Sequence, residues 1–460
     1  MTYTFCVDFG STFTKLCVLD LTRGELVMTT KHPTTVGTDA SIALLAGLAQ
    51  AKRYVGEKGV KEGKIVTSSS AAGGLRMVVV GLTKRFSLLA GKNVALGAGA
   101  RIIKTYANYL TEENVCEIEK INPEILLLCG GIEGGNVDRI LYNAKMLKEA
   151  DISSYVVYAG NQEVAPYIRQ ELVTNSIPCY MAENVFPDYG QLNAAPAGNI
   201  IRQLFMERIA GAKGLASAFP IIGRVQMPTP AAVLAGGQLL AQGTDKESGL
   251  GSLMVFDVGG ATTDVYSYME ESGCGAKHVG SPEPFAKRTV EGDLGVRSSC
   301  LSLAEAMDLT AGAKRAGRSA EQFLSDCRRR AAIGTYVPDN EFQKEVDVVL
   351  AEGAVEISAR RHCGKVTNAY ARKVSETLEG KDLREIGSMV GTGGPIIHSG
   401  NPAGLLSQAL RRPWEKELLL PEESKFYLDK RYILYAIGLC AGINPAGALH
   451  IAKENIVEVD

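Results

Sequence analysis

The chain has 460 residues, and its 49 Lys and Arg against 51 Asp and Glu leave a formal net charge of −2. This length exceeds what one ordinary hydrophobic core organises and indicates two or three domains. Hydrophobic residues make up 46% and charged residues 22%, which is typical of a globular protein and excludes a disordered one. The near-neutral charge, without a long basic run, excludes broad electrostatic attraction to nucleic acid or an anionic membrane.

The sequence shows no targeting or membrane signal. Residues 1–5 contain no basic segment followed by an apolar core, and the longest apolar run near the end, 432–442, is about half of the roughly 20 residues that a spanning helix needs. The ten cysteines form no C-x-x-C pair, and the five histidines have no metal-ligand spacing. We therefore expect a cytoplasmic protein with buried thiols, no membrane segment and no metal held by side chains alone.

The first residues predict a β-hairpin. Residues 3–8 alternate between polar and apolar, a polar turn follows, and residues 15–21 have the pattern of a returning strand. Helical spacing covers 40–54 and ends near Gly56, and residues 64–70 have the pattern of a strand.

From about residue 115 the pattern changes to alternating strands and helices. We expect strands at 124–129, 154–159 and 178–181, with helices at 137–149 and 164–173 between them. This alternation is typical of a parallel sheet with crossover helices. We interpret about 115–185 as an inserted α/β subdomain. Its glycine-rich loop, 130–135, is interpreted as a decoy or a partner-facing loop.

The second half repeats the plan of the opening. After a helix at 199–212, a second strand-hairpin-strand unit is expected at 253–257 and 263–268. Helices dominate from about 300 to 380, where the three arginines 328–330 are expected on a solvated helix face. A strand at 385–390 and an apolar helix at 432–442 follow. The predicted organisation is a first domain at 1–250, a second at 251–428 and a terminal segment at 429–460.

The turn of the first hairpin has the composition of a phosphate-binding loop. A glycine at a hairpin tip lets backbone N–H groups turn toward phosphate oxygens. Hydroxyl groups add donors, a lysine adds a point charge, and the aspartate at the strand end would hold Mg²⁺ through water, because that ion keeps much of its hydration shell. The candidates are Asp8, Gly10, Ser11, Thr12, Thr14 and Lys15. The alternative is a plain tight turn with a capping aspartate.

The second hairpin has the same parts about 250 residues later. Its candidates are Asp257, Gly259, Gly260, Ala261, Thr262 and Thr263. Two such turns, one in each domain, could clamp a polyphosphate from both sides of a cleft. A third glycine cluster would let the backbone approach a flat purine, although a glycine-rich bend before a helix is the alternative. Its candidates are Gly391, Gly393, Gly394 and Pro395. The G-x-x-x-x-G-K-S/T loop of P-loop enzymes is absent.

Together these loops resemble the nucleotide motifs of the superfamily of actin, sugar kinases and heat-shock ATPases. Residues 8–12 resemble its first phosphate motif, 256–264 its second and 391–395 its adenosine motif. The resemblance implies an α/β protein with two ribonuclease H-like (actin-like ATPase) domains around a cleft that holds ATP and Mg²⁺. It also implies a terminal helix that returns to the first domain. Asp8 and Asp257 are then the candidates for holding the metal and for catalysis.

A closer resemblance is to the MutL-type accessory proteins of glutamate mutase. The segment Arg288-Thr289-Val290-Glu291-Gly292-Asp293-Leu294-Gly295-Val296-Arg297 is similar to a signature of that family, as are 257–265 and 390–395. Further similarity at 227–233 and 282–288 makes the resemblance run nearly end to end. The mismatch-repair protein of the same name is unrelated. Within the signature, Glu291 and Asp293 are candidates for an acidic lining of the site; the alternative is an acidic turn that caps a helix.

This resemblance implies an ATP-hydrolysing helper of adenosylcobalamin-dependent mutases, which opens the mutase so that damaged cobalamin can leave. Two alternatives stay open. A small-molecule kinase would need an aspartate base in a substrate pocket, and no motif marks one. An activator of radical dehydratases would need cysteines that hold an iron–sulfur cluster, and none lies in a convincing loop. The expected partners are mutase subunits, without nucleic acid or membrane, and homo-oligomerisation stays open.

Overall fold

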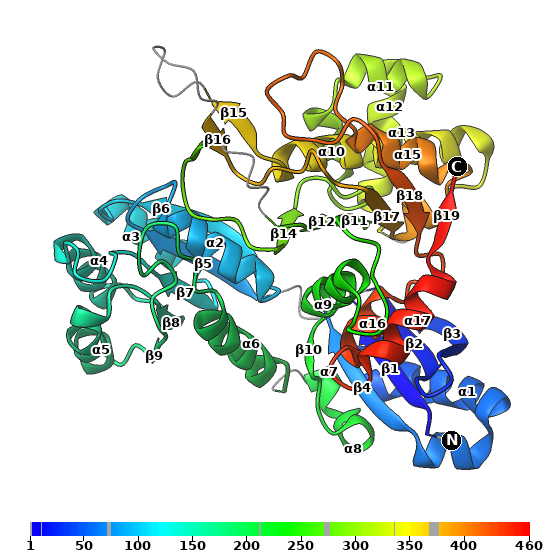
Figure 1. The fold of residues 1–460 in the computed structure, drawn as a ribbon, viewed down its shortest axis with the longest axis horizontal. Helices are drawn as coiled ribbons and strands as arrows, with labels where there is room; N and C mark the ends of the chain where they lie inside the picture. Colours follow the sequence, from blue (N-terminus) through cyan, green and yellow to red (C-terminus); the bar gives the residue numbers. More distant parts are fainter. Residues whose placement is uncertain are drawn as a thin grey trace.

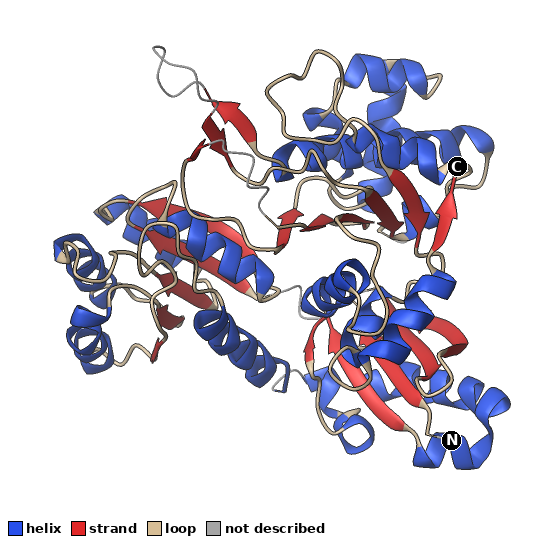
Figure 2. Ribbon diagram, viewed as in Figure 1, coloured by secondary structure: helices blue, strands red, loops and turns tan. Residues whose placement is uncertain are grey.

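The computed structural model describes residues 2–10, 12–70, 75–210, 213–270, 277–334, 336–367 and 377–460. Figure 1 shows three bodies: a sheet near the N-terminus at lower right, a second at upper right, and a third, coloured cyan to green, at left. Figure 2 shows that each body has its own sheet with helices packed beside it. None of the helices within these ranges combines the length and apolar character needed to cross a bilayer.

The first sheet has the strand order β10-β4-β1-β2-β3. Strand β1 pairs antiparallel with β2, which pairs antiparallel with β3, whereas β4 pairs parallel with β1 and with β10. The elements are β1 (Thr4–Phe9), β2 (Phe13–Asp20), β3 (Glu25–Pro33), α1 (Ala40–Glu62), β4 (Lys64–Ser69), α7 (Lys213–Ala216), α8 (Phe219–Ile222) and β10 (Met227–Pro228). The predicted hairpin and the strand after it are confirmed. Helix α1 runs beyond the predicted end, past a non-helical Gly56.

The second sheet has the order β14-β12-β11-β17-β18-β19. Strands β11, β12 and β14 are antiparallel, β17 and β18 run parallel on the other side of β11, and β19 adds the end of the chain. The strands are β11 (Leu253–Val258), β12 (Thr263–Tyr268), β14 (Ala286–Glu291), β17 (Ser388–Thr392), β18 (Lys425–Leu428) and β19 (Val457–Val459). A small sheet beside it contains β13 (Lys277–His278), β15 (Lys365–Thr367) and β16 (Thr377–Glu379).

The two large sheets share one plan. In each, an antiparallel hairpin and a third antiparallel strand lie on one side of the first strand, and parallel strands lie on the other. This is the arrangement of two ribonuclease H-like domains with an additional α/β sheet inserted in the first half, so the predicted fold class is confirmed.

The helical part of the second domain buries one arginine that the sequence placed in solvent. The helices are α10 (Cys300–Ala306), α11 (Leu309–Arg315), α12 (Ala320–Ala332), α13 (Glu341–His362), α14 (Gly394–Ile397) and α15 (Pro402–Leu406). Arg328 and Arg329 are exposed, but Arg330 is fully buried and donates from Nε to Asp347 and from Nη1 to Gln343. The solvated-face prediction is wrong for Arg330, because the helical rotation turns it toward α13.

The inserted sheet is entirely parallel, with the order β6-β5-β7-β8-β9. Its elements are β5 (Arg76–Gly81), α2 (Ser87–Gly97), β6 (Arg101–Ala107), α3 (Glu112–Ile121), β7 (Ile125–Leu128), α4 (Asp138–Lys148), β8 (Tyr155–Tyr158), α5 (Ala165–Thr174), β9 (Cys179–Met181) and α6 (Ala195–Ala210). The expected subdomain at 115–185 therefore omits α6, which follows it, and β5, α2 and β6, which precede it. The preceding elements belong with it because β5 pairs with β7 at the centre of the sheet.

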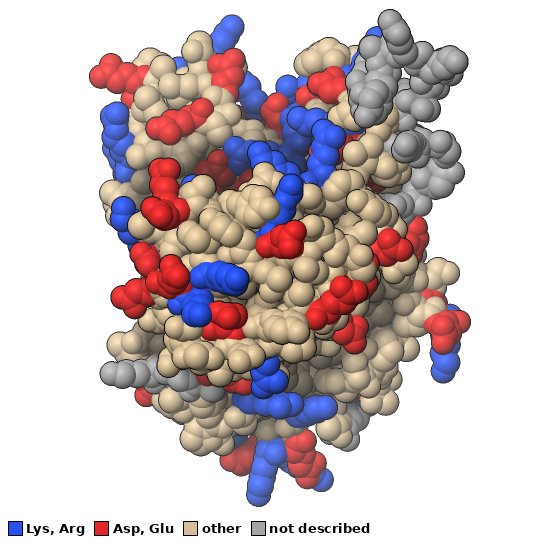
Figure 3. All heavy atoms as spheres, turned by 90° about the vertical axis from the view of Figure 1, so that its left-hand side faces the viewer, with Lys and Arg blue, Asp and Glu red and all other residues tan. Residues whose placement is uncertain are grey.

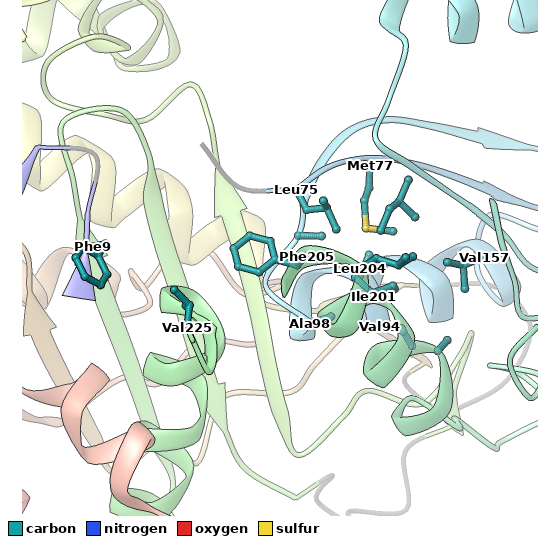
Figure 4. Close-up of a cluster of buried hydrophobic side chains, with 14 of the residues drawn as sticks. Phe9, Leu75, Met77, Val94, Ala98, Val157, Ile201, Leu204, Phe205 and Val225 are labelled. Carbon is teal, nitrogen blue, oxygen red and sulfur yellow. The ribbon is translucent and has the colours of Figure 1, made fainter. Parts of the chain in front are cut away.

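Alternate residues of the inserted strands enter two different cores, as period-two alternation requires. Met77 and Val157 pack with side chains of α2 and α6, including Val94 and Leu204, in the cluster of Figure 4. The next residues along the strands pack against α3, α4 and α5 on the other face. The cluster of Figure 4 also includes Phe9 of β1, so the core of the insertion is continuous with that of the first domain.

Three helices lie between the two domains: α9 (Thr229–Gln242), α16 (Leu434–Cys440) and α17 (Pro445–Asn455). Helix α16 contacts β1 and β4, α17 contacts β3, and α9 contacts β4, β11 and β12. The backbones of α9 and α16 touch. A Cβ on Gly236 would collide with the carbonyl oxygen of Leu434, and a Cβ on Gly438 with that of Ala232. Glycine at both positions therefore sets how closely α9 and α16 approach each other.

A buried carboxylate starts α16. Asp429 is fully buried and accepts hydrogen bonds from the backbone N–H groups of Ile433 (2.9 Å) and Leu434 (3.1 Å). These N–H groups would otherwise lack a partner at the helix start. Burial raises the pKa of Asp429 to about 6, against the partial opposition of those two bonds.

We predict that Gly438→Ala destabilises the protein by about 3 kcal/mol, the upper end of overpacking costs, because the added methyl group meets backbone rather than a flexible side chain. Urea denaturation would measure this as a lower midpoint. Gly442→Ala is the matched control in the same segment, since a Cβ there has no atom within 4 Å. Equal midpoints for the two variants would contradict the proposed contact.

The buried Asp429 should make the stability of the protein depend on pH. The pKa of Asp429 in the folded state, about 6, lies above the value of about 4 of an unfolded chain. Its stabilising contribution is therefore complete below about pH 4 and is lost as the pH rises through about 6. Relative to Asp429→Asn, the wild-type free energy of unfolding should fall by on the order of 3 kcal/mol across this window. Denaturation at several pH values checks this, and a difference that stays constant with pH would refute it.

Candidate functional site

The two predicted hairpins form the same glycine turn. Gly10 donates its N–H to the carbonyl of Phe13 (3.1 Å), and Gly259 donates to that of Thr262 (2.9 Å). A Cβ would lie 2.6 Å from the Phe13 oxygen at the first tip and 3.0 Å from the Thr262 oxygen at the second. Side chains larger than hydrogen therefore crowd both turns, which explains the glycines that the sequence shows.

The first carboxylate is buried among polar groups. Asp8 pairs in register with Lys15, whose Nζ lies 3.5 Å from Oδ2. Its Oδ1 accepts hydrogen bonds from the hydroxyls of Ser68 and Thr229. Three elements, β2, β4 and the start of α9, thus fix the orientation of this side chain.

Tyr432, which the sequence analysis did not identify, joins the two hairpins. Its hydroxyl donates to Oδ1 of Asp257 (2.8 Å), and the Nζ of Lys15 lies 3.5 Å from the centre of its ring. A cation over an aromatic face is an attractive contact. A continuous chain of contacts, Asp8–Lys15–Tyr432–Asp257, therefore runs from one domain to the other. Tyr432 adopts a left-handed backbone conformation with φ 57°, which is rare for a bulky residue and typical of functional positions.

The second carboxylate has a perturbed pKa. Burial, together with the charge of Asp264, raises the pKa of Asp257 to about 6, against the opposing effects of Lys15 and the hydroxyl of Tyr432. Asp264 faces Asp257 across the hairpin register. Two carboxylates this close favour a cation between or beside them.

The family-signature segment supports the second turn. The N–H of Val296 donates to the carbonyl of Gly259 (3.1 Å), and the N–H of Arg297 donates to that of Gly260 (2.7 Å). Ser299 donates its hydroxyl to the carbonyl of Ala261 (2.7 Å). These three carbonyl groups of the turn thus accept hydrogen bonds from the segment that follows β14, which holds the turn in place.

The third glycine cluster lies against the second hairpin. Gly393 has φ 92°, and a Cβ there would collide with the carbonyl of Val258. Gly391 lies against Ile396, and Gly394 and Pro395 begin the short helix α14. The three predicted loops are therefore neighbours.

Several candidate side chains already have internal partners. Thr263 donates its hydroxyl to the carbonyl of Leu294, and Thr262 donates to Asp264. Glu291 is paired in register with Thr263 and forms an ion pair with Arg361, which also contacts Asp293. The acidic pair of the signature thus lies beside the second turn with its charge partly neutralised.

The remaining candidates of the first loop are Ser11, Thr12 and Thr14, and the last two differ in how exposed they are. Thr12 is exposed, and its carbonyl accepts from the N–H of Thr34 (2.9 Å). Thr14 precedes Lys15 on β2, so its side chain lies on the opposite face of the strand from Lys15. Its hydroxyl is buried and has no partner among the described residues. Ser11 lies outside the described residues.

These residues fit a nucleotide with Mg²⁺. Carboxylate oxygens at Asp8 and Asp257 are the ligand type that Mg²⁺ takes, directly or through water. Lys15 supplies a cation for phosphate oxygens, and the two glycine turns present backbone at close range. The hydroxyl of Thr392, whose strand position is beside Asp257, is buried with no partner within the described chain, which leaves a polar group for a ligand to satisfy.

Three site residues escaped the sequence analysis: Ser68, Thr229 and Tyr432. Ser68 and Thr229 stand in small-residue and Thr-Pro segments that carry no recognisable chemistry alone. Tyr432 looks like the first residue of an apolar helix. The available signal was only that it follows Asp429 in a polar stretch, Asp-Lys-Arg-Tyr, ahead of that helix.

Comparisons with known proteins give one extensive match. The sequence model of the family described as "MutL protein" matches residues 4–456. The "Protein MutL" of Clostridium tetanomorphum is 39% identical over 464 residues, which cover 98% of this chain and 99% of that protein.

Similarities to solved structures are weaker. Gluconate kinase from Lactobacillus acidophilus is 12% identical, with a TM-score of 0.35 over 100% of this chain and 93% of that one. A diol dehydratase-reactivating factor in nucleotide-free form is 12% identical, with a TM-score of 0.38 over 96% and 100%. TM-scores this low do not establish a shared fold, which rests instead on the strand order of the sheets.

The family match extends along almost the entire chain, and so does the alignment with the clostridial relative. The chain belongs to the MutL protein family.

Proposed function

We propose that this protein binds ATP with Mg²⁺ between its two ribonuclease H-like domains and hydrolyses it. The observation that supports this most directly is the contact chain from Asp8 through Lys15 and Tyr432 to Asp257, which joins the two glycine turns. Lys15 and the two aspartates now neutralise one another. When ATP and Mg²⁺ bind, Lys15 can contact the phosphates instead, and the aspartates can contact the cation.

In this proposal each residue has a distinct role. Lys15 turns from Asp8 toward phosphate oxygens, and the two carboxylates hold the hydrated cation. A bound Mg²⁺ supplies charge neutralisation at the phosphates. Asp257 orients the attacking water by accepting a hydrogen bond from it. Tyr432 holds Asp257 in position through its hydroxyl.

Hydrolysis would move the domains. The two turns belong to separate halves, so the loss of the γ-phosphate removes a link between them. The crossing of α9 and α16 is where the halves pivot in this proposal, because α9 contacts strands of both large sheets and packs directly on α16.

We further propose that this motion serves an adenosylcobalamin-dependent mutase such as glutamate mutase, which the protein would open so that damaged cobalamin leaves. The support is membership of the MutL family together with the accessory-protein signature at 288–297. Figure 3 views the molecule from the side of the inserted subdomain, where acidic and basic side chains are interspersed. Docking on this face would rest on shape and individual charge pairs rather than on a field of one sign.

Asp257→Ala should abolish ATP hydrolysis while nucleotide binding persists, because the turns and Lys15 remain. Phosphate release measures turnover, and calorimetry measures binding. Asp245→Ala, at an exposed position in the loop before β11, is the control and should behave as wild type. Undiminished turnover in Asp257→Ala would remove the proposal. ATP consumption that instead requires a small molecule and phosphorylates it would favour a kinase.

The proposed interaction with a mutase can be tested independently of ATP hydrolysis. Affinity capture from the native host should enrich subunits of an adenosylcobalamin mutase, with a yield that differs between ATP and ADP. Incubating the inactivated mutase with the protein, ATP and fresh adenosylcobalamin should then restore activity, and Asp257→Ala should not. Recovery of activity without ATP would contradict the reactivase role.

A further inference from the structure

The inserted subdomain meets the second domain along a buried polar contact between α2 and β14. On α2, the side-chain amide of Asn93 donates to Glu283 (3.2 Å). Lys287 of β14 donates to the other oxygen of Glu283 (3.0 Å). All three side chains are at most 9% exposed. We call this contact the α2–β14 interface.

One arginine of this interface also reaches the candidate nucleotide site. Arg288 is 5% exposed and donates from Nε (2.9 Å) and Nη2 (2.6 Å) to Oδ1 of Asp264. Its Nη1 donates to the backbone carbonyls of Leu96 (3.0 Å) and Ala100 (3.2 Å). A single guanidinium therefore ties the strand of the second glycine turn to the C-terminal end of α2.

The hydrogen bonds of the Arg288 guanidinium depend on the charges around it. A buried guanidinium needs partners on every side, because an unpaired charge in the interior is costly. The last carbonyls of a helix carry partial negative charge and lack partners within the helix, so they complement a cation. Leu96 already accepts the N–H of Gly99, which closes the end of α2. The bonds from Arg288 therefore reinforce the turn at the helix end.

Asp264 connects Arg288 to the second glycine turn, so a ligand bound at that turn can affect Arg288 through Asp264. It faces Asp257 across the hairpin, and its side chain accepts from Arg288 on one side and from Thr262 of the turn on the other. A cation held at Asp257 would attract Asp264 as well. The carboxylate would then be shared between that cation and Arg288, and the position of the guanidinium would change.

We propose that Arg288 is a positioning residue that transmits the nucleotide state of the cleft to the inserted subdomain through the end of α2. The inference rests on the proposed nucleotide binding. With nucleotide and Mg²⁺ bound, Asp264 is drawn toward the cleft, Arg288 follows it, and its bonds to Leu96 and Ala100 weaken. The end of α2 loosens, and with it the packing of α2 on its sheet.

Hydrogen exchange of residues 91–102, with and without ADP and Mg²⁺, tests this. In the wild type, nucleotide should raise exchange there by about fivefold, the factor that corresponds to one hydrogen bond of about 1 kcal/mol. In Arg288→Lys the nucleotide-dependent change should vanish, although calorimetry still detects nucleotide. A lysine keeps the charge, but its donors all sit on one nitrogen, which cannot span from Asp264 to the carbonyls of Leu96 and Ala100 as the three nitrogens of the guanidinium do.

Asn93→Ala is the matched control. It weakens the same interface without altering Arg288, so it should raise exchange in α2 both with and without nucleotide and keep the nucleotide-dependent change. If Arg288→Lys does not fold by circular dichroism, Asp264→Asn replaces it, and the same loss of response is expected.

These measurements distinguish a failure of the Arg288 proposal from a failure of the proposed nucleotide binding. A nucleotide response that persists in Arg288→Lys, or that disappears equally in Asn93→Ala, overturns the relay. Calorimetric binding to the wild type without any change at 91–102 also overturns it. An absence of calorimetric binding to the wild type overturns the proposed function itself.

Discussion

The contact on which this architecture depends is the backbone-to-backbone crossing of α9 and α16. Gly236 and Gly438 let the two helices touch without side chains between them. Helix α9 contacts strands of both large sheets, and α16 contacts β1 and β4 of the first. Larger residues at either position would push the two helices apart. A displaced α16 would carry Tyr432, which lies just before it, away from Asp257. The spacing of the candidate site is therefore set by packing some distance from it.

Charges of opposite sign are balanced around the two glycine turns. Four buried or half-buried carboxylates gather near the turns, and each has a protein partner. Lys15 contacts Asp8, Tyr432 contacts Asp257, Arg288 holds Asp264, and backbone N–H groups hold Asp429. Burial raises the pKa values of both Asp257 and Asp429, and the charge of Asp264 adds to the effect at Asp257. A site of this kind gains from a bound cation, which connects the electrostatics to the proposed function.

Much of the fold could be predicted from sequence because it is encoded locally. The two hairpins follow from alternation around glycine turns, and the parallel insertion follows from strands alternating with helices. The prediction failed at 76–107, where β5 and β6 resemble any apolar strands. Only pairing with β7 assigns them to the inserted sheet. It failed at Arg330 for a related reason, since the sequence does not show that α13 covers that face of α12.

The sequence by itself determined the chemistry of the turns: glycine where the backbone must bend, aspartate at the strand end, and hydroxyl and lysine side chains nearby. The tertiary structure alone decided which residues complete the site. Ser68, Thr229 and Tyr432 come from three distant segments, and Arg288 reaches from the second domain to α2. The physical reason is that turn chemistry depends on backbone angles a few residues apart. Side-chain partnerships instead depend on how sheets and helices pack, which no local pattern records.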